Sequence, residues 1–332
     1  LSMINVEDPL KVHDTDRIQQ KPREENEQLK ANMEKKGRIQ KKEDGTHVLH
    51  SYSRNGHPME FPLDNPNLTD NHRDGLLKVI DKYRDCFAKE QSEVGVMNNV
   101  SVNIEMTKPK VIRHKVQRLN PDLIKQGHEK ILSLLESGAV EQSGSIYNNR
   151  CVFVKKPDGS YRLCQDYRDL NAVIRGLRYE LPLFEEICDY LAYRKVSIFT
   201  TFDLFSGYHQ IALDPRCRHF TRFALPGSPA VHFCVVPMGL SIASGAFLFA
   251  VNHALGDAIY KNTICFCDDL LIYSGSPEQH LKDLEEVFSR LQAANLRVSA
   301  KKCNMAQKEV IYLGHLISGD GVKPDPRKME TI

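Results

Sequence analysis

Acidic residues at the ends of two apolar stretches are the feature of this sequence that most limits its fold. Residues 196–204 and 263–273 are rich in β-branched and aromatic side chains, which predicts two buried strands. Asp203 follows the apolar part of the first stretch, and Asp268 and Asp269 interrupt the second. Burying an unpaired carboxylate costs free energy, so a simple core strand does not contain one. These carboxylates are therefore expected to reach a cation or a water-filled cleft.

The pair Asp268-Asp269 suits the tip of a β-hairpin that projects both carboxylates toward a metal. Neighbouring ionised aspartates repel each other, and a hard, oxygen-seeking ion such as Mg²⁺ removes that repulsion. With Asp203 as a third carboxylate, the set can hold two ions that align the attacking and leaving oxygens of a nucleotidyl transfer. The pair alone leaves an alternative open, because it can also be a polar turn between two strands.

Capping signals predict the elements around these strands. Thr69, Asn120 and Ser276 each precede a run in which apolar residues recur every three or four positions, which is typical of a capped amphipathic helix. The turn at 157–160 lies between two alternating segments and indicates a hairpin. The expected elements are helices at about 69–87, 120–138, 240–255 and 276–295, hairpin strands at 151–155 and 161–166, and a final strand pair within 311–317.

The N-terminal part differs from the rest in composition. Charged and amide side chains dominate residues 1–67, and apolar residues have no regular spacing there. Segments of this kind usually stay solvated, so residues 1–67 are predicted to be a flexible linker, in which a short helix at 24–36 is the alternative. Residues 68–108 are predicted to form an N-terminal helical extension, and residues 109–332 the main domain.

The overall composition is that of a globular protein. The 332 residues are 41% apolar and 27% charged, and their formal net charge of +2 does not by itself indicate nucleic-acid binding. No stretch contains the roughly 20 apolar residues of a membrane-spanning helix, and the N-terminus has no signal pattern. The nine cysteines have no paired spacing, which favours reduced thiols. We therefore expect a cytoplasmic or nuclear protein.

The three aspartates lie in longer segments with recognisable motifs. Phe199–Ile211 reads Phe-Thr-Thr-Phe-Asp-Leu-Phe-Ser-Gly-Tyr-His-Gln-Ile, and Phe266–Asp269 reads Phe-Cys-Asp-Asp. Four further segments complete a collinear series: Val154–Arg162 with Asp166–Asn171, Val236–Leu240, Ala300–Cys303 and Tyr312–His315. Together these segments resemble the polymerase domain of reverse transcriptases, most closely that of gypsy-type long-terminal-repeat retrotransposons. The two aspartate motifs are similar to the first catalytic motif and the Tyr-x-Asp-Asp box of that family.

The resemblance implies an α+β fold of the right-hand polymerase type, with fingers, a ferredoxin-like palm sheet and a truncated thumb. The expected fingers are residues 109–178 and 212–234, the palm residues 179–211 and 235–317, and the start of the thumb residues 318–332. The implied activity is that of an RNA- and DNA-directed DNA polymerase, which adds dNTPs to a primer 3′-hydroxyl. The implied partners are an RNA or DNA template with its primer, dNTPs, and ribonuclease H and integrase domains of the same Pol polyprotein.

Further expectations concern the rest of such a polyprotein. The sequence has no Asp-Thr-Gly or Asp-Ser-Gly protease loop and no paired His and Cys integrase finger. A ribonuclease H domain is expected after Ile332, so the chain is expected to be a fragment. The resemblance also implies a virus-like particle in the cytoplasm, with the nucleus as the alternative location.

The resemblance assigns metal ligands and a proton donor. Asp203, Asp268 and Asp269 are the implied ligands of two Mg²⁺ ions, for which Mn²⁺ is a possible substitute. Lys302 is similar to a lysine that protonates the departing pyrophosphate. Leu313–His315 resembles the turn of the primer grip.

The resemblance also assigns residues to the nucleotide. Lys155 and Arg162 lie on facing strands of the predicted hairpin, where they can fold onto the β- and γ-phosphates or serve only as surface charge. Tyr208 is similar to the aromatic residue that excludes a 2′-hydroxyl, although a tyrosine in such a run can simply pack in a core. Leu204 and Met238 are assigned to the nucleotide pocket, with packing as the alternative for Met238.

Two segments depart from the family pattern. Phe266 stands where Tyr is usual, and Val236–Leu240 replaces Met-Pro-Phe-Gly-Leu beside the implied pocket, so pocket shape and activity are in question. Arg168 and Asn171 are assigned to fingers structure and template contact.

Two alternative functions stay open. One is a viral-type RNA polymerase, which Tyr208 disfavours and which NTP use would reveal. The other is a non-catalytic relic, whose nucleic-acid binding would be salt-sensitive but independent of magnesium.

Overall fold

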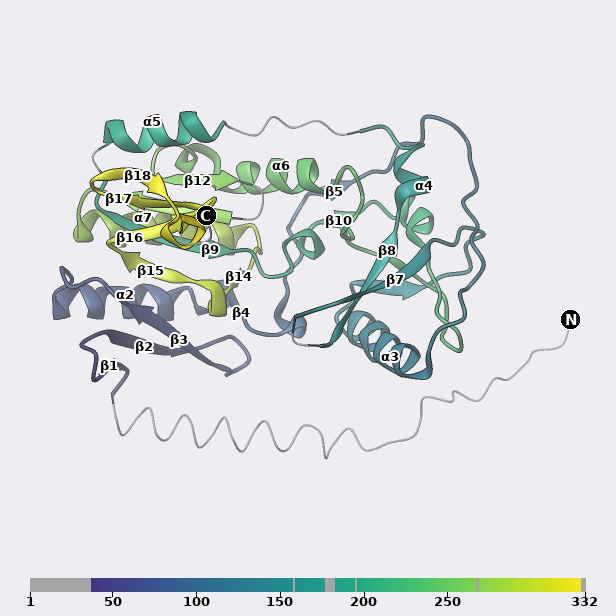
Figure 1. Ribbon diagram of the computed structural model, residues 1–332, viewed down its shortest axis with the longest axis horizontal. Helices are drawn as coiled ribbons and strands as arrows, with labels where there is room; N and C mark the ends of the chain where they lie inside the picture. Colours follow the sequence, from purple (N-terminus) through teal and green to yellow (C-terminus); the bar gives the residue numbers. More distant parts are fainter. Residues whose placement is uncertain (1–36, 158, 177–182, 195, 267–268, 330–332) are drawn as a thin grey trace, which may run out of the picture.

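The computed structural model describes residues 37–329, with gaps at 158, 177–182, 195 and 267–268. Two groups of elements lie side by side along the long axis of the molecule (Figure 1). The larger group is built on an antiparallel sheet in the order β12-β13-β9-β15. Its strands are β9 (Ile198–Asp203), β12 (Thr263–Phe266), β13 (Asp269–Ser274) and β15 (Asn304–Gln307). The two predicted apolar stretches thus form β9, β12 and β13 of the palm sheet.

Helices pack on and around this sheet through buried apolar side chains. Helix α7 (Pro277–Ala293) contacts β13, and its predicted cap is confirmed, since the Ser276 side chain accepts a hydrogen bond from the Gln279 amide. Phe288 on α7 stacks on Phe202 of β9 with ring centroids 5.7 Å apart. Three further helices belong to this group: α2 (Asp70–Lys82), α5 (Phe184–Arg194) and α6 (Ala243–Leu255). The predicted helices near 70, 243 and 277 are therefore confirmed, whereas α5 was not predicted.

The prediction of a flexible linker at 1–67 is wrong for its described part. Residues 37–67 contain a three-stranded antiparallel sheet of β1 (Ile39–Lys41), β2 (His47–Tyr52) and β3 (Pro58–Leu63). Alternate side chains of β3 are buried, and Phe61 packs edge-on against Phe87 with ring centroids 5.2 Å apart. The apolar residues are few, but they share one face of the sheet. The predicted helix at 24–36 lies outside the described residues.

Residues 68–108 are also not an extension, because they contribute strands and core side chains to the main body. β4 (Phe87–Ala88) pairs in parallel with β14 (Val298–Ser299). β5 (Ser101–Val102) pairs in parallel with β10 (Ala212–Leu213). Helix α2 packs against α7 and β2. The N-terminal segment and the palm therefore form one hydrophobic core.

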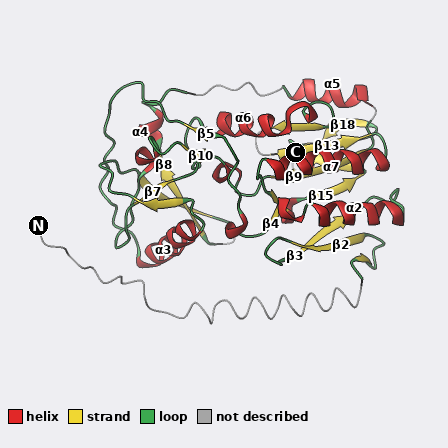
Figure 2. Cartoon of the chain, turned by 180° about the vertical axis from the view of Figure 1, so that it is seen from behind, coloured by secondary structure: helices red, strands yellow, loops and turns green. Residues whose placement is uncertain are grey.

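The second group of elements contains the predicted hairpin, which is confirmed. β7 (Arg150–Lys155) and β8 (Tyr161–Asp166) pair along their full length and lie beside α3 (Pro121–Glu136) in both views (Figures 1 and 2). The Asn120 side chain caps α3 as predicted, and Gly138 ends it with φ +70°. This group also contains β6 (Val140–Gln142), α4 (Arg168–Asn171) and β11 (Val231–Phe233).

The C-terminal strands form a separate small sheet. β16 (Glu309–Tyr312) and β17 (His315–Ser318) confirm the predicted strand pair, and β18 (Gly321–Pro324) adds a third antiparallel strand. The expected start of the thumb at 318–332 is therefore corrected in part, because 318–324 complete this sheet before the short helix α8 (Pro326–Met329). None of the helices within the described ranges has the length and apolar character to cross a membrane.

Candidate active site

Asp203 and Asp269 lie directly opposite each other on neighbouring strands of the palm sheet. Asp203 is the last residue of β9 and Asp269 the first of β13, and the register pairs the two. Directly paired residues of an antiparallel sheet have Cβ atoms about 4.5–5.5 Å apart, so both carboxylates can share a cation. Asp268 immediately precedes Asp269 but lies outside the described residues.

The surrounding core fixes the backbone of both aspartates. Phe202 and Leu270, the neighbours of the two aspartates along their strands, are fully buried, whereas the aspartates themselves are partly exposed. The buried Tyr312 of β16 donates its hydroxyl to the Asp269 carbonyl at 3.1 Å. The C-terminal sheet therefore fixes the backbone at the start of β13.

Lys302 reaches the same edge from η6, a short 3-10 helix at Ala300–Lys302. Its ammonium contacts the Asp203 carboxylate, and 64% of the lysine side chain stays exposed. No group of three or more His, Cys, Asp or Glu side chains suited to a metal occurs within the described ranges, which exclude Asp268. The donors present at this edge are carboxylate oxygens, the ligands that Mg²⁺ prefers, so the residues fit a hard divalent ion.

The segment after Asp203 is fixed by a buried amide whose role was not predicted. Gln210 donates from Nε2 to the carbonyls of Phe205 at 2.8 Å and Arg297 at 2.7 Å. Its Oε1 accepts from the Arg297 amide at 2.6 Å. A signal was present, because an amide inside an apolar motif needs buried partners. Leu204 forms a β-bridge with Val298 and its side chain is buried in the core, and its assignment to the nucleotide pocket stays a prediction.

Tyr208 lies on η3 (Gly207–Gln210), and helix α6 fixes its ring. The ring meets Phe247 edge-on with centroids 5.5 Å apart, and its hydroxyl is 3.3 Å from the Ser244 Oγ. A Cβ atom on Gly207 would lie 2.7 Å from the Phe247 ring, so only glycine permits this approach. The tyrosine is thus held five residues beyond Asp203 and is partly exposed.

Asn171 joins the fingers to the loop that carries Met238. Its Nδ2 donates to the Gly239 carbonyl and its Oδ1 accepts from the Ser241 amide, both at 2.8 Å. Gly239 has φ +92°, and Met238 is 54% exposed at the tip of this loop. These contacts make Asn171 a positioning residue for the loop. Its predicted contact with the template stays a prediction.

The two predicted phosphate-binding cations face opposite sides of the hairpin. Arg162 pairs with Val154, whereas Lys155 pairs with Tyr161, and directly paired residues share a face. The face of Lys155 also carries Phe153, which packs against Gly127 of α3. Arg162 therefore stands on the open face of the hairpin and Lys155 on the face that covers α3.

Residues 154–317 match the family model described as reverse transcriptase (RNA-dependent DNA polymerase). The retrovirus-related Pol polyprotein from transposon 297 of Drosophila melanogaster is 32% identical over 82% of this chain and 26% of its own length. The transposon Tf2-3 polyprotein of Schizosaccharomyces pombe is 33% identical over 66% of this chain and 16% of its own length. The chain therefore spans about a quarter or less of these relatives.

Solved structures share the fold. A foamy viral protease-reverse transcriptase in complex with double-stranded DNA superposes with a TM-score of 0.70 at 20% identity, over 86% of this chain and 57% of that one. At this identity the match establishes the α+β polymerase architecture alone. The motif residues, the palm geometry and the family match together identify residues 154–317 as a member of the reverse transcriptase family, of the kind found in the Pol polyproteins of gypsy-type retrotransposons.

Proposed function

We propose that this chain is the polymerase part of a retrotransposon Pol polyprotein and adds dNTPs to a primer 3′-hydroxyl on an RNA or DNA template. The observation that carries the proposal is the pairing of Asp203 with Asp269 where the two central strands of the palm sheet, β9 and β13, meet at one end. Tyr208 stands on the same segment as Asp203, and Lys302 contacts that aspartate. Asp203 and Asp269 would thus supply carboxylates for metal ions, Tyr208 a ring that faces the sugar, and Lys302 a proton donor.

The carboxylates of Asp203, Asp268 and Asp269 would hold two Mg²⁺ ions, or Mn²⁺ in their place. When bound there, the ions supply Lewis acidity to the 3′-hydroxyl and neutralise charge on the triphosphate. The rigid, buried strands beneath Asp203 and Asp269 keep the carboxylates in place, so little reorganisation is needed during the reaction.

The other residues act on the nucleotide. The primer 3′-hydroxyl would lose its proton to water as its oxygen attacks the α-phosphorus and the bond to the β-phosphate breaks. The ammonium of Lys302 would give a proton to the pyrophosphate that leaves and would regain one from water. The Tyr208 ring occupies the space that a 2′-hydroxyl would need. Arg162, on the open face of the hairpin, can approach the β- and γ-phosphates, and Asn171 positions the loop of Met238 at the pocket.

The wider setting follows from the polyprotein relatives. Ribonuclease H and integrase domains would belong to the same polyprotein, and the protein would act in a cytoplasmic virus-like particle or in the nucleus. Detection of the chain by antibody in sedimenting particles tests this part, and recovery only as free soluble protein would contradict it.

Magnesium-dependent extension of a DNA primer on an RNA template tests the activity. The native chain should extend with dNTPs and not with NTPs, and the Asp268→Asn, Asp269→Asn double variant should not extend. Asp74→Asn, an exposed carboxylate on α2, is the matched control and should extend normally. If the native chain binds primer-template but never extends it, the catalytic proposal fails and a non-catalytic nucleic-acid-binding role replaces it.

A further inference from the structure

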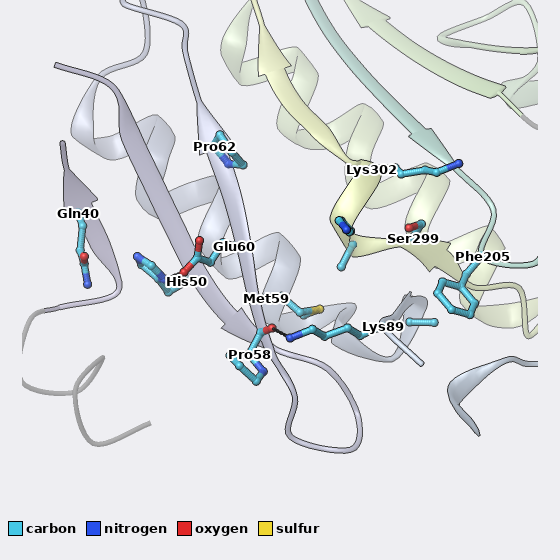
Figure 3. Close-up of a pocket in the computed structure, with 13 residues that line it drawn as sticks. Gln40, His50, Pro58, Met59, Glu60, Pro62, Lys89, Phe205, Ser299 and Lys302 are labelled. Atoms are coloured by element: carbon cyan, nitrogen blue, oxygen red, sulfur yellow. Dashed lines mark hydrogen bonds and ion pairs between the residues drawn. The ribbon is translucent and has the colours of Figure 1, made fainter. Parts of the chain in front are cut away.

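A cavity of about 860 Å³ opens between the N-terminal sheet and η6, beside the palm (Figure 3). Its volume lies within the roughly 300–1,000 Å³ of ordinary small-molecule sites. Asp203 and Asp269 do not line it, although Phe205 and Lys302 do. The cavity therefore adjoins the proposed active site and shares Lys302 with it. One wall is β3, which lies outside the segment that matches the reverse transcriptase family.

The lining changes in chemistry from one end of the cavity to the other. Figure 3 shows Lys302 and Phe205 toward one end, Met59 and Lys89 between, and His50 with Glu60 toward the other. Lys301 and Lys302 of η6 therefore lie on the side nearest Asp203, Lys89 and apolar side chains line the middle, and the hydrogen-bonding side chains of His50 and Glu60 lie farthest from the palm. A ligand that fits this cavity would have an anionic end, an apolar middle and a hydrogen-bonding end.

The lysine end suits a chain of phosphates. Lys301 and Lys302 line this end, Lys89 follows toward the middle of the cavity, and all three residues are exposed to solvent. Lys89 is held in place because its Nζ donates to the Pro58 carbonyl at 3.0 Å. Several ammonium groups around one opening attract a multiply charged anion more strongly than a single one does.

The opposite end suits an uncharged, hydrogen-bonding ring. His50 is only 8% exposed, and its Nε2 has no hydrogen-bond partner among the described residues. Burial lowers the pKa of His50, so the imidazole is neutral near pH 7 and does not attract a second phosphate. The carboxylate of Glu60 lies 3.7 Å from the His50 Nδ1 and adds an acceptor. A buried ring nitrogen without a partner costs free energy, which a ligand can recover.

We infer that this cavity is a second nucleotide site, which binds a nucleoside polyphosphate with its phosphates at Lys89 and Lys301 and its base at His50 and Glu60. Met59 and Phe205 provide the apolar wall between these ends. The site goes beyond the proposed polymerase activity, because it uses none of the catalytic carboxylates. A nucleotide bound there would place its phosphates beside Lys302, the residue that contacts Asp203.

Binding of ATP to the full chain in EDTA, measured by calorimetry, tests the inference. ATP is chosen because its 2′-hydroxyl disfavours the proposed active site at Tyr208. Lys89→Ala and Lys301→Ala should each weaken ATP binding about tenfold, since each removes a charge-assisted contact. Lys78→Ala, an exposed lysine on α2 that does not line the cavity, should leave it unchanged.

The base end is tested with half-ligands. His50→Phe keeps the ring but removes Nε2, so it should weaken ATP binding several-fold and leave tripolyphosphate binding unchanged. Glu60→Gln supplies the same test if His50→Phe does not fold, as judged by circular dichroism. Equal affinities for ATP and tripolyphosphate in the native chain and in these variants would overturn a nucleotide site and leave only an anion-binding surface.

A variant of the catalytic centre separates this site from the polymerase. Asp269→Asn should abolish primer extension and retain ATP binding. If ATP binding is lost in Asp269→Asn but survives Lys89→Ala and Lys301→Ala, the nucleotide lies at the catalytic centre. The second site is then refuted while the proposed polymerase stands. Undetectable ATP binding by the native, folded chain would also refute it.

Discussion

The palm strands and the fingers hairpin support their functional residues in different ways. In β9 and β13 nearly every side chain is buried, and only the terminal Asp203 and Asp269 are partly exposed. In β7 and β8 most side chains are partly or fully exposed, and only one face packs against α3. A two-stranded ribbon covered on one face has little stability of its own. The carboxylates proposed to bind metal are thus fixed, whereas the cations proposed to bind phosphate stand on a less tightly packed element.

The largest expected effect comes from the fixed region. Asp203→Asn should reduce the rate of primer extension by about a thousandfold, because it removes a charge aimed at the reacting phosphates. Urea unfolding should show little change, since the side chain is partly exposed. Single-turnover extension measures the rate, with Asp74→Asn as control. If Asp203→Asn is strongly destabilised but still extends the primer, the carboxylate serves the stability of the palm and not its chemistry, and the comparison fails.

The next largest difference should be in the free energy of unfolding lost when a side chain is truncated in the palm or in the hairpin. Leu270→Ala removes a fully buried side chain between the palm strands and should lower the free energy of unfolding by about 3 kcal/mol. Val154→Ala in the hairpin, where 51% of the residue is exposed, should cost about 0.5 kcal/mol or less. Urea denaturation followed by circular dichroism measures both. Equal losses would show that the hairpin is as well packed as the palm.

The palm should also be the region that loses stability in mild acid. His280 is buried behind β9, where its Nε2 is 2.8 Å from the Thr200 Oγ1 and its Nδ1 2.9 Å from the Ser274 Oγ. Burial lowers the pKa of His280 to about 4 from an ordinary 6.5. The unfolded chain therefore gains a proton as pH falls through 6.5, and the folded chain does so only near 4.

Stability should consequently fall between pH 6.5 and 4 by about 3 kcal/mol through this one group. His209, partly buried beside Phe233, has a pKa lowered to about 4 by the same cause and should act in the same direction. The measurement is the free energy of unfolding against pH for the native chain and His280→Gln. Identical slopes for the two proteins would show that His280 does not titrate on unfolding.

The smallest effects should come from the hairpin and depend on its register. Arg162→Ala should raise the KM for dNTP about tenfold, because Arg162 stands on the open face. Lys155→Ala should change it less than about threefold, since that side chain shares the face packed on α3. Steady-state kinetics on one primer-template measures both. Equal effects would mean that the hairpin changes register or twists when the nucleotide binds.

The features predictable from the sequence are those with local causes. The caps at Thr69, Asn120 and Ser276 are local hydrogen bonds, and each was predicted at the correct residue. The aspartates at the strand ends were predictable because a carboxylate is conspicuous in an apolar run. Their exact pairing across β9 and β13 required the sheet register, which a sequence does not state.

The features that were missed have distant partners. The N-terminal sheet was read as linker because its burial depends on α2 and on the palm, as in the hydrogen bond from Asn65 to the Ala306 carbonyl. Asn171 and Gln210 hold backbone groups 68 and 87 positions away. The opposite orientations of Lys155 and Arg162 follow from which residues pair across the hairpin. None of these contacts produces a regular spacing of apolar residues from which the sequence could predict it.

The hydrogen bond between Asn65 and Ala306 joins residues 241 positions apart, and it bears on the order of folding during synthesis. Strands β1–β3 leave the ribosome long before β15, against which β3 packs. They must wait, with Met59 and Phe61 uncovered, until most of the palm has been made. The domain is therefore expected to be completed late and slowly on the ribosome, and chaperones that bind exposed apolar segments would favour its assembly.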